Sequence, residues 1–155
     1  MALFGKFRRK ETVRAPGQPP EAPRGQRIYA IGDIHGRADL LEQLHRQIED
    51  DAAGFDGAKR VVYLGDMIDR GNHSREVIDL LLEQPLAGFE PVYLMGNHEH
   101  ALLSFLDNPQ SIAGWLGWGG RETLQSYGVE SRFTDDLDAL REKLAVSPGD
   151  GHLDF

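Results

Sequence analysis

Residues 61–71, VVYLGDMIDRG, join a short apolar run to a polar turn that is bounded by two glycines. Four branched and aromatic residues in a row are too few for a helix and are typical of a strand buried in a sheet. The same combination occurs twice more, in IYAIGDIHG at residues 28–36 and in VYLMGNHE at residues 92–99. We therefore expect three buried strands, each followed at once by a glycine and a polar turn.

The two stretches between these runs have the periodicity of amphipathic helices. We expect the second helix to begin with Ser74 as its N-cap. Strand, helix, strand, helix and strand in this order predict an α/β fold, in which two right-handed βαβ units build a parallel sheet. After Asn97 the pattern is mainly helical. The apolar positions of the two connecting helices are Leu40, Leu41, Leu44 and Ile48 in the first, and Val77, Ile78, Leu81 and Leu82 in the second.

The composition divides the chain into a tail and a body. Residues 1–26 are basic and rich in proline, which predicts a flexible tail before a domain at residues 27–155. The net charge of -8 argues against nucleic acid as a partner, and the absence of cysteine excludes thiolate nucleophiles and disulfides. No apolar stretch approaches the roughly 20 residues of a membrane span, so we expect a cytoplasmic protein.

The three polar turns are predicted to form one site. The carboxyl ends of parallel strands share one edge of a sheet, and ligands bind at that edge. Asp33, His35, Asp66 and Asn97 supply oxygen and imidazole ligands without sulfur, a set suited to Mn, Fe or Zn. A carboxylate between two such sets can bridge two ions, which together activate a water as nucleophile and neutralise a phosphoryl group.

The remaining polar residues of the turns suit the other tasks of phosphoester hydrolysis. Arg70 is always charged and can contact two phosphate oxygens at once. His98 can act as the general acid for the departing oxygen, while Asp69 orients its ring and stabilises the imidazolium. These are the predicted catalytic residues.

The three motifs resemble those of the calcineurin-like metallophosphoesterases, and specifically the serine/threonine phosphoprotein phosphatases of the PPP type in a small bacterial form. The resemblance covers residues 27–155 and includes the segment from Gly119 to Gly128. It implies two divalent metal ions, with manganese expected first and iron or zinc as alternatives. It also implies the following roles: Asp33 and His35 bind the first metal, Asp66 bridges both, Asn97 binds the second and contacts the substrate, Arg70 holds phosphate, and Asp69 with His98 forms the acid pair.

The resemblance also implies an architecture and a substrate. The family fold is a two-sheet sandwich flanked by helices (αββα), whose site is completed by two histidines and an arginine later in the chain. We therefore expect these residues to be the N-terminal part of a longer enzyme, truncated at the C-terminus, with phosphorylated proteins or peptides as substrates. Its oligomeric state is left open.

Two other functions remain open. Symmetric diadenosine tetraphosphate hydrolases resemble this chain in the first motif. They typically have alanine at the position of Asp69 and aspartate at that of Glu99. A noncatalytic truncated module that binds phosphate is the second alternative.

Several further residues lie near the motifs but outside the predicted catalytic and metal-binding set. His45, His73 and His100 are expected on the surface or behind the ligands, and Glu99 is expected to orient a neighbour or start a helix. Core packing and a place beside the cleft are equally open for Trp115 and Trp118.

Overall fold

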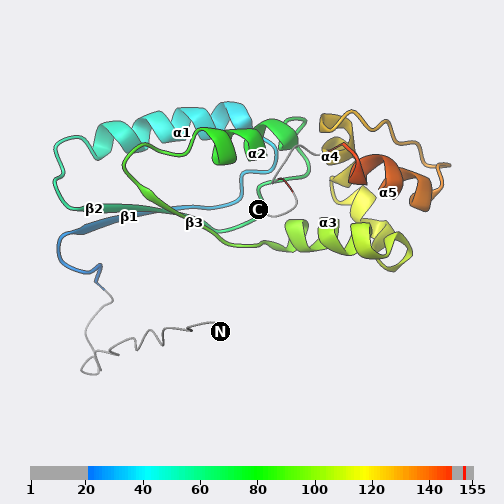
Figure 1. Ribbon diagram of the computed structural model, residues 1–155, viewed down its shortest axis with the longest axis horizontal. Coiled ribbons are helices and arrows are strands. Elements are labelled where there is room, and N and C mark those ends of the chain that lie inside the picture. The colour runs from blue at the N-terminus through cyan, green and yellow to red at the C-terminus, as the bar shows by residue number, and fades with distance from the viewer. Residues whose placement is uncertain (1–20, 148–151, 153–155) are drawn as a thin grey trace, which may run out of the picture.

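The computed structural model describes residues 21–147 and His152 (Figure 1). Most of the predicted basic tail, residues 1–20, lies outside the described residues. The first strand begins at Gln26, at the end of the predicted tail.

The sheet has three parallel strands, as predicted, and the structure gives their order as β1-β2-β3. They are β1 (Gln26–Ile31), β2 (Ala58–Tyr63) and β3 (Glu90–Tyr93). The strands begin two or three residues before the apolar runs because polar residues continue the ladder; Arg60, for example, is paired with Glu90 in register and by an ion pair. All three strands end at the same edge, where the polar turns begin.

Two helices cover one face of this sheet (Figure 1). They are α1 (Ala38–Asp51) and α2 (Ser74–Glu83), and they lie in the two crossover connections. The buried stripe of α1 differs from the predicted one, because Leu40 and Leu44 are exposed while His45 is buried. The Nε2 atom of His45 lies 2.9 Å from the Tyr63 hydroxyl, so the prediction of a surface or ligand-supporting histidine at this position was wrong.

The opposite face of the sheet is open among the described residues (Figure 1). Ile28, Leu64 and Leu94 are 42%, 51% and 45% exposed. This single sheet and its helical cover correspond to one half of the expected sandwich; a second sheet is not found in the part of the chain that the structure describes.

The rest of the described chain forms a helical half beyond the carboxyl edge of the sheet (Figure 1). It packs around two buried aromatic rings, Phe105 and Trp115, whose centroids lie 5.0 Å apart. Its elements are α3 (Asn97–Asp107), the 3-10 helix η1 (Pro109–Gly117), α4 (Gly120–Ser126) and α5 (Leu137–Ala145).

Helices α5 and α2 begin in different ways. Asp136 caps α5 by accepting a hydrogen bond from the amide of Ala139 at 3.0 Å. Ser74 begins α2 but does not cap it, because its hydroxyl is buried against Thr123 and the amide of Asp69. The predicted N-cap was therefore wrong, since tertiary contacts recruit this side chain.

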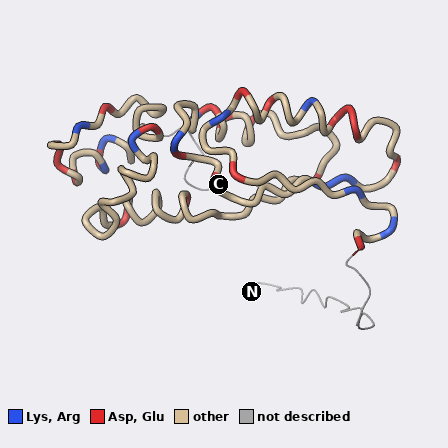
Figure 2. Tube along the Cα trace, turned by 180° about the vertical axis from the view of Figure 1, so that it is seen from behind, with Lys and Arg blue, Asp and Glu red and all other residues tan. Residues whose placement is uncertain are grey.

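Charged residues of both signs alternate along the described chain (Figure 2). A small basic group, Arg27, Lys59 and Arg60, lies at the amino end of the sheet, away from the polar turns. Within the described residues, no helix has both the length and the apolar character that crossing a bilayer requires.

Candidate metal and phosphate site

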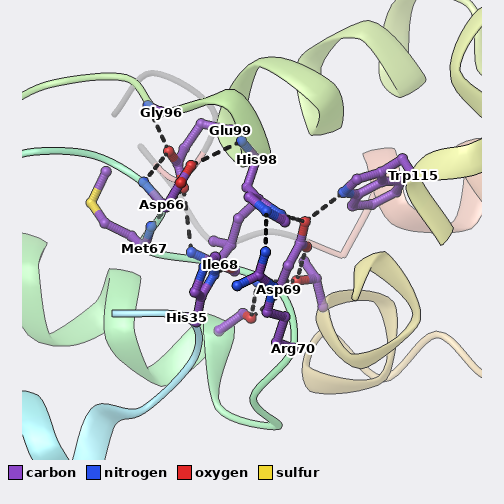
Figure 3. A network of polar contacts seen from close by, with 12 residues as sticks. His35, Asp66, Met67, Ile68, Asp69, Arg70, Gly96, His98, Glu99 and Trp115 are labelled. Carbon is purple, nitrogen blue, oxygen red and sulfur yellow. Dashed lines mark hydrogen bonds and ion pairs between the residues drawn. The ribbon is translucent and has the colours of Figure 1, made fainter. Parts of the chain in front are cut away.

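The three polar turns meet at the carboxyl edge of the sheet, as predicted (Figure 3). The amide of His35 donates to the carbonyl of Asp66 at 3.0 Å, and the amide of Gly71 donates to the carbonyl of His35 at 3.1 Å. The amide of His98 donates to the Asp66 carboxylate at 3.1 Å. Backbone contacts therefore connect the turns that follow β1, β2 and β3.

The backbone of this site is strained. Among the described non-glycine residues, positive φ occurs only at His35, Asp66, Asp69 and Arg70, with values between 47° and 72°. Such conformations persist only where the surroundings enforce them, and they concentrate at functional sites. Gly96 is needed for one close approach, since a Cβ there would lie 2.2 Å from a carboxylate oxygen of Asp66.

His35 presents the nitrogen that a metal would need. Its Nδ1 lies 2.9 Å from the carbonyl of Ile68, and because a carbonyl can only accept, Nδ1 carries the proton. Its Nε2 is buried and has no hydrogen-bond partner among the residues that the structure describes. A buried lone pair without a partner is costly unless a ligand takes it up, so this residue fits a metal ion.

A possible ligand group surrounds this nitrogen. His35, Asp66 and His98 each offer one ligand atom, and these atoms all lie within 4.8 Å of one another. Two nitrogens and a carboxylate oxygen suit Mn, Fe or Zn. Asp33 is not part of this group, although its Oδ2 lies 3.6 Å from His35 Nε2, and its side chain is 66% exposed. Asn97 is exposed at the start of α3.

Asp69 and His98 form a buried pair. The distance between His98 Nδ1 and Asp69 Oδ2 is 2.7 Å, and both side chains are almost inaccessible. On the other side of the ring, Nη2 of Arg70 lies 3.3 Å from His98 Nε2. A guanidinium can only donate, so Nε2 accepts and the ring proton resides on Nδ1, where it is donated to Asp69.

Asp69 lies in an unusual environment for a carboxylate. Burial raises the pKa of its carboxyl above the ordinary value, and hydrogen bonds from Thr123, His98 and Trp115 oppose that rise. The Thr123 hydroxyl and the Trp115 indole N–H donate to it at 2.6 Å and 2.7 Å. The sequence predicted a contact with Asp69 for neither residue, although a place beside the cleft had been left open for Trp115. Thr123 falls within the segment that resembles the family, and that resemblance was the only signal for it.

Glu99 connects two of the turns. Its carboxylate accepts hydrogen bonds from the amides of Asp66, Met67 and Gly96, each at 2.8 Å, and from Ile68 at 3.3 Å (Figure 3). The expectation that Glu99 orients a neighbour and starts a helix is confirmed. It secures the backbone that presents Asp66 without lying among the candidate ligand atoms.

A groove of about 860 Å³ opens beside the pair and leads into the helical half. It borders Arg70, Asn97 and His98, so it offers room for a substrate next to the predicted phosphate contacts. The two tryptophans divide between the alternatives left open above: Trp115 is fully buried, whereas Trp118 is half exposed and lines the groove. The other lining residues are Leu116, Gly117, Gly119, Arg121, Glu122 and Phe133.

Comparison with known proteins yields two informative relatives. Over 124 residues the chain is 28% identical to the asymmetrical bis(5'-nucleosyl)-tetraphosphatase PrpE of Oceanobacillus iheyensis, covering 76% of this chain and 43% of that protein. Over 81 residues it is 37% identical to the serine/threonine-protein phosphatase BSL2 of Arabidopsis thaliana, covering 51% of this chain and 8% of that protein. The chain thus spans less than half the length of either relative.

The family assignment agrees with the geometry. Both relatives are phosphoester or phosphoanhydride hydrolases by name, and the residues that the motifs singled out are gathered at one edge of the sheet. The family profile described as calcineurin-like phosphoesterase matches residues 26–152, which include all three strands and every described helix. This chain belongs to the calcineurin-like phosphoesterase family.

Proposed function

We propose that the protein is a metal-dependent phosphomonoester hydrolase that acts on phosphoserine or phosphothreonine in proteins. The observation that carries this proposal is the buried Nε2 of His35, which lacks a hydrogen-bond partner in the described part of the chain and lies next to Asp66 and to the His98–Asp69 pair. One side of the site offers ligands for a metal, and the other offers a proton donor with a buried counter-charge.

The proposed metal ligands are the four residues predicted from the sequence. Asp33, His35, Asp66 and Asn97 would hold two divalent ions, manganese first and iron or zinc otherwise, and these would supply an activated water and neutralise phosphate charge. Asp66 would be the residue shared by both ions, and two contacts support that role: its amide donates to Glu99, and its Oδ1 accepts from the amide of His98.

Arg70 and His98 would act in sequence on the phosphoryl group. The guanidinium of Arg70, now 3.3 Å from His98 Nε2, would turn to the phosphate oxygens, where charge-assisted contacts are stronger. His98 Nε2 would then be free to carry a proton to the departing oxygen. Asp69, held 2.7 Å from Nδ1, would stabilise the imidazolium that this requires.

The substrate assignment rests on two residues and one relative. Asp69 and Glu99 differ from the residues that the symmetric tetraphosphate hydrolases typically have, and BSL2 is named a serine/threonine-protein phosphatase. The groove of about 860 Å³ beside His98 supports a substrate larger than a free phosphate.

Hydrolysis of a dinucleoside tetraphosphate is the second candidate. PrpE, which aligns with 76% of this chain, is named an asymmetrical bis(5'-nucleosyl)-tetraphosphatase. Arg70 and Arg121 both line the groove and offer two positive charges to a chain of phosphates.

A direct comparison of substrates tests the proposal. The protein, supplied with Mn²⁺, should hydrolyse a phosphoserine peptide faster than diadenosine tetraphosphate, and a chelator should stop the reaction. Exclusive cleavage of the dinucleotide would overturn the phosphoprotein assignment in favour of the second candidate. Phosphate binding without turnover of either substrate would instead support the noncatalytic alternative.

The Asp66→Asn variant tests the role of the metal. It should lower the rate of hydrolysis by roughly 10³-fold, because a metal-held water and its charge stabilisation contribute several kcal/mol. Asp56→Asn is the matched control, since Asp56 is exposed in the turn between α1 and β2. An unchanged, metal-independent rate in Asp66→Asn would refute the mechanism.

A further inference from the structure

The carboxylate of Asp69 is held by two residues of the helical half. Its Oδ2 accepts the indole N–H of Trp115 as well as the ring N–H of His98, both at 2.7 Å. Its Oδ1 accepts the hydroxyl of Thr123 at 2.6 Å. Three donors therefore surround one buried carboxylate, and only one of them belongs to the proposed acid pair.

The directions of these hydrogen bonds are fixed by chemistry. An indole nitrogen can only donate, so Trp115 cannot reverse its contact. The amide of Asp69 donates to Thr123 Oγ1 at 2.9 Å, and the same hydroxyl has its proton available for Oδ1. Thr123 thus contacts both the main chain and the side chain of Asp69, which restrains rotation of the carboxylate about its own axis.

Trp115 has little freedom to move. Its side chain is fully buried, and its ring packs against Phe105. Gly120 also lies against the ring, where an added Cβ would approach within 2.5 Å of Cε2, the carbon bonded to the indole nitrogen. The indole N–H is consequently a fixed donor that tolerates only one position of the Asp69 oxygen.

We propose that Trp115 and Thr123 are positioning residues for protonation of the leaving group. They hold the Asp69 carboxylate where it can accept the Nδ1 proton of His98 and support the imidazolium. Neither residue lines the groove, so both act through Asp69 and not on the substrate. This inference rests on the proposed phosphomonoesterase function and adds the helical half to its chemistry.

The proposal predicts a dependence on the leaving group. A serine alkoxide is a poor leaving group and needs a proton, whereas a nitrophenolate departs without one. Loss of the positioning contacts should therefore slow hydrolysis of a phosphoserine peptide much more than that of p-nitrophenyl phosphate. The variants are Trp115→Phe, which removes the N–H, and Thr123→Val, which removes the hydroxyl at nearly constant shape.

In each variant kcat for the phosphoserine peptide should fall by roughly 10- to 100-fold, the range typical of residues that orient a reactive group, with KM little changed. The rate with p-nitrophenyl phosphate should fall by less than about threefold, because protonation contributes little to its departure. Thr123→Ser should restore most of the activity, since it keeps the hydroxyl.

Leu140→Val is the packing control. It alters the same buried core from α5 and removes no hydrogen bond to Asp69, so it should lower stability without changing the ratio of the two rates. Equal losses on both substrates in Trp115→Phe and Thr123→Val would show a merely structural role and overturn the proposal.

A spectroscopic measurement separates this inference from the proposed function. Nitrogen NMR of the His98 ring in the chain without added metal should show the proton on Nδ1. In Trp115→Phe and Thr123→Val, the proton should be shared between both nitrogens, whereas Leu140→Val should resemble the unmodified chain. Unchanged ring signals in both variants would overturn the positioning role. A chain that hydrolyses neither substrate would refute the proposed function, and the ring signals would still decide the positioning role.

Discussion

The sheet half and the helical half of the molecule contribute different things to the site. The sheet half supplies the turns with the strained backbone, and with them His35, Asp66 and Arg70. The helical half surrounds the Asp69 carboxylate with Trp115 and Thr123, neither of which lines the groove. The turns thus present groups to the substrate, whereas η1 and α4 hold Asp69 in place, and His98 at the start of α3 connects the two. Substitutions can test how far the two halves depend on each other.

The largest effect is expected from Phe105→Ala in the core of the helical half. Phe105 is fully buried, and removing such a ring leaves a cavity that costs about 3–5 kcal/mol of unfolding free energy. Denaturant unfolding measures that loss, and hydrogen exchange locates it. Amides of α3, η1, α4 and α5 should lose protection before those of the sheet.

Leu103→Ala on the same helix is the control for that substitution, because Leu103 is 37% exposed. It should cost far less. Equal loss of protection in the sheet and the helices of Phe105→Ala would show that the halves unfold as one unit and would contradict the division drawn above.

Gly119→Ala should disrupt the junction between the halves. The φ of Gly119 is +116°, and a Cβ there would lie 2.3 Å from the amide nitrogen of Arg70, which itself donates to the Gly119 carbonyl. We expect a loss of about 2–3 kcal/mol in unfolding free energy, since strain and displacement add. Gly117→Ala should be nearly neutral, because its Cβ would meet nothing within 4 Å. Similar midpoints for the two variants in denaturant would argue against a tight junction.

Glu99→Gln should weaken the sheet side of the site by a smaller amount. The amide would turn an NH₂ group toward backbone N–H donors that now share a carboxylate, at a cost of about 1–2 kcal/mol. Thermal or denaturant unfolding measures the change, with the exposed Glu83→Gln as the matched substitution. Identical stabilities of Glu99→Gln and Glu83→Gln would mean that the backbone N–H groups do not need the Glu99 carboxylate.

The smallest effect concerns pH and is confined to the sheet half. Burial lowers the pKa of His45, although Glu49 and Glu42 on the same helix oppose the shift. Below the ordinary histidine pKa of about 6.5, the unfolded chain binds this proton and the folded chain resists it. The stability that neutral His45 contributes is therefore present at pH 7. It is lost as the pH falls below the ordinary pKa of about 6.5.

Unfolding midpoints at pH 7 and pH 5 measure this loss. The midpoint should fall less in His45→Gln than in the unmodified chain, while His73→Gln, at an exposed position, should leave the fall unchanged. A pH dependence that His45→Gln does not alter would assign the effect to other groups.

Much of the sheet half could be predicted from the sequence, because its signals are local. Short apolar runs, glycines and polar turns recur about every 30 residues, and they predict both the parallel strands and the convergence of the turns that carry His35, Asp66 and His98. The helical half was predicted as helices only. Its role depends on the contact of Trp115 with Asp69, 46 positions apart in sequence, and nothing in either local pattern indicates this pairing.

The burial of His45 and the hydroxyl contacts of Ser74 were missed for a related reason. Helical periodicity treats histidine and serine as polar, so it assigns them to the surface or to a cap. In the structure each finds a polar partner inside the fold, Tyr63 for His45 and Thr123 for Ser74, and such a partner becomes visible only when the strands and helices are assembled.

The four amides gathered by Glu99 form an anion-binding nest that the protein fills with its own side chain. Its loop is therefore ordered without help from a cation. Metal should then bind at a preformed site, without coupled folding. The polypeptide should lose little conformational entropy on binding, and its circular dichroism spectrum should not change. Apoprotein and holoprotein would share one shape, so demetallation should be fully reversible.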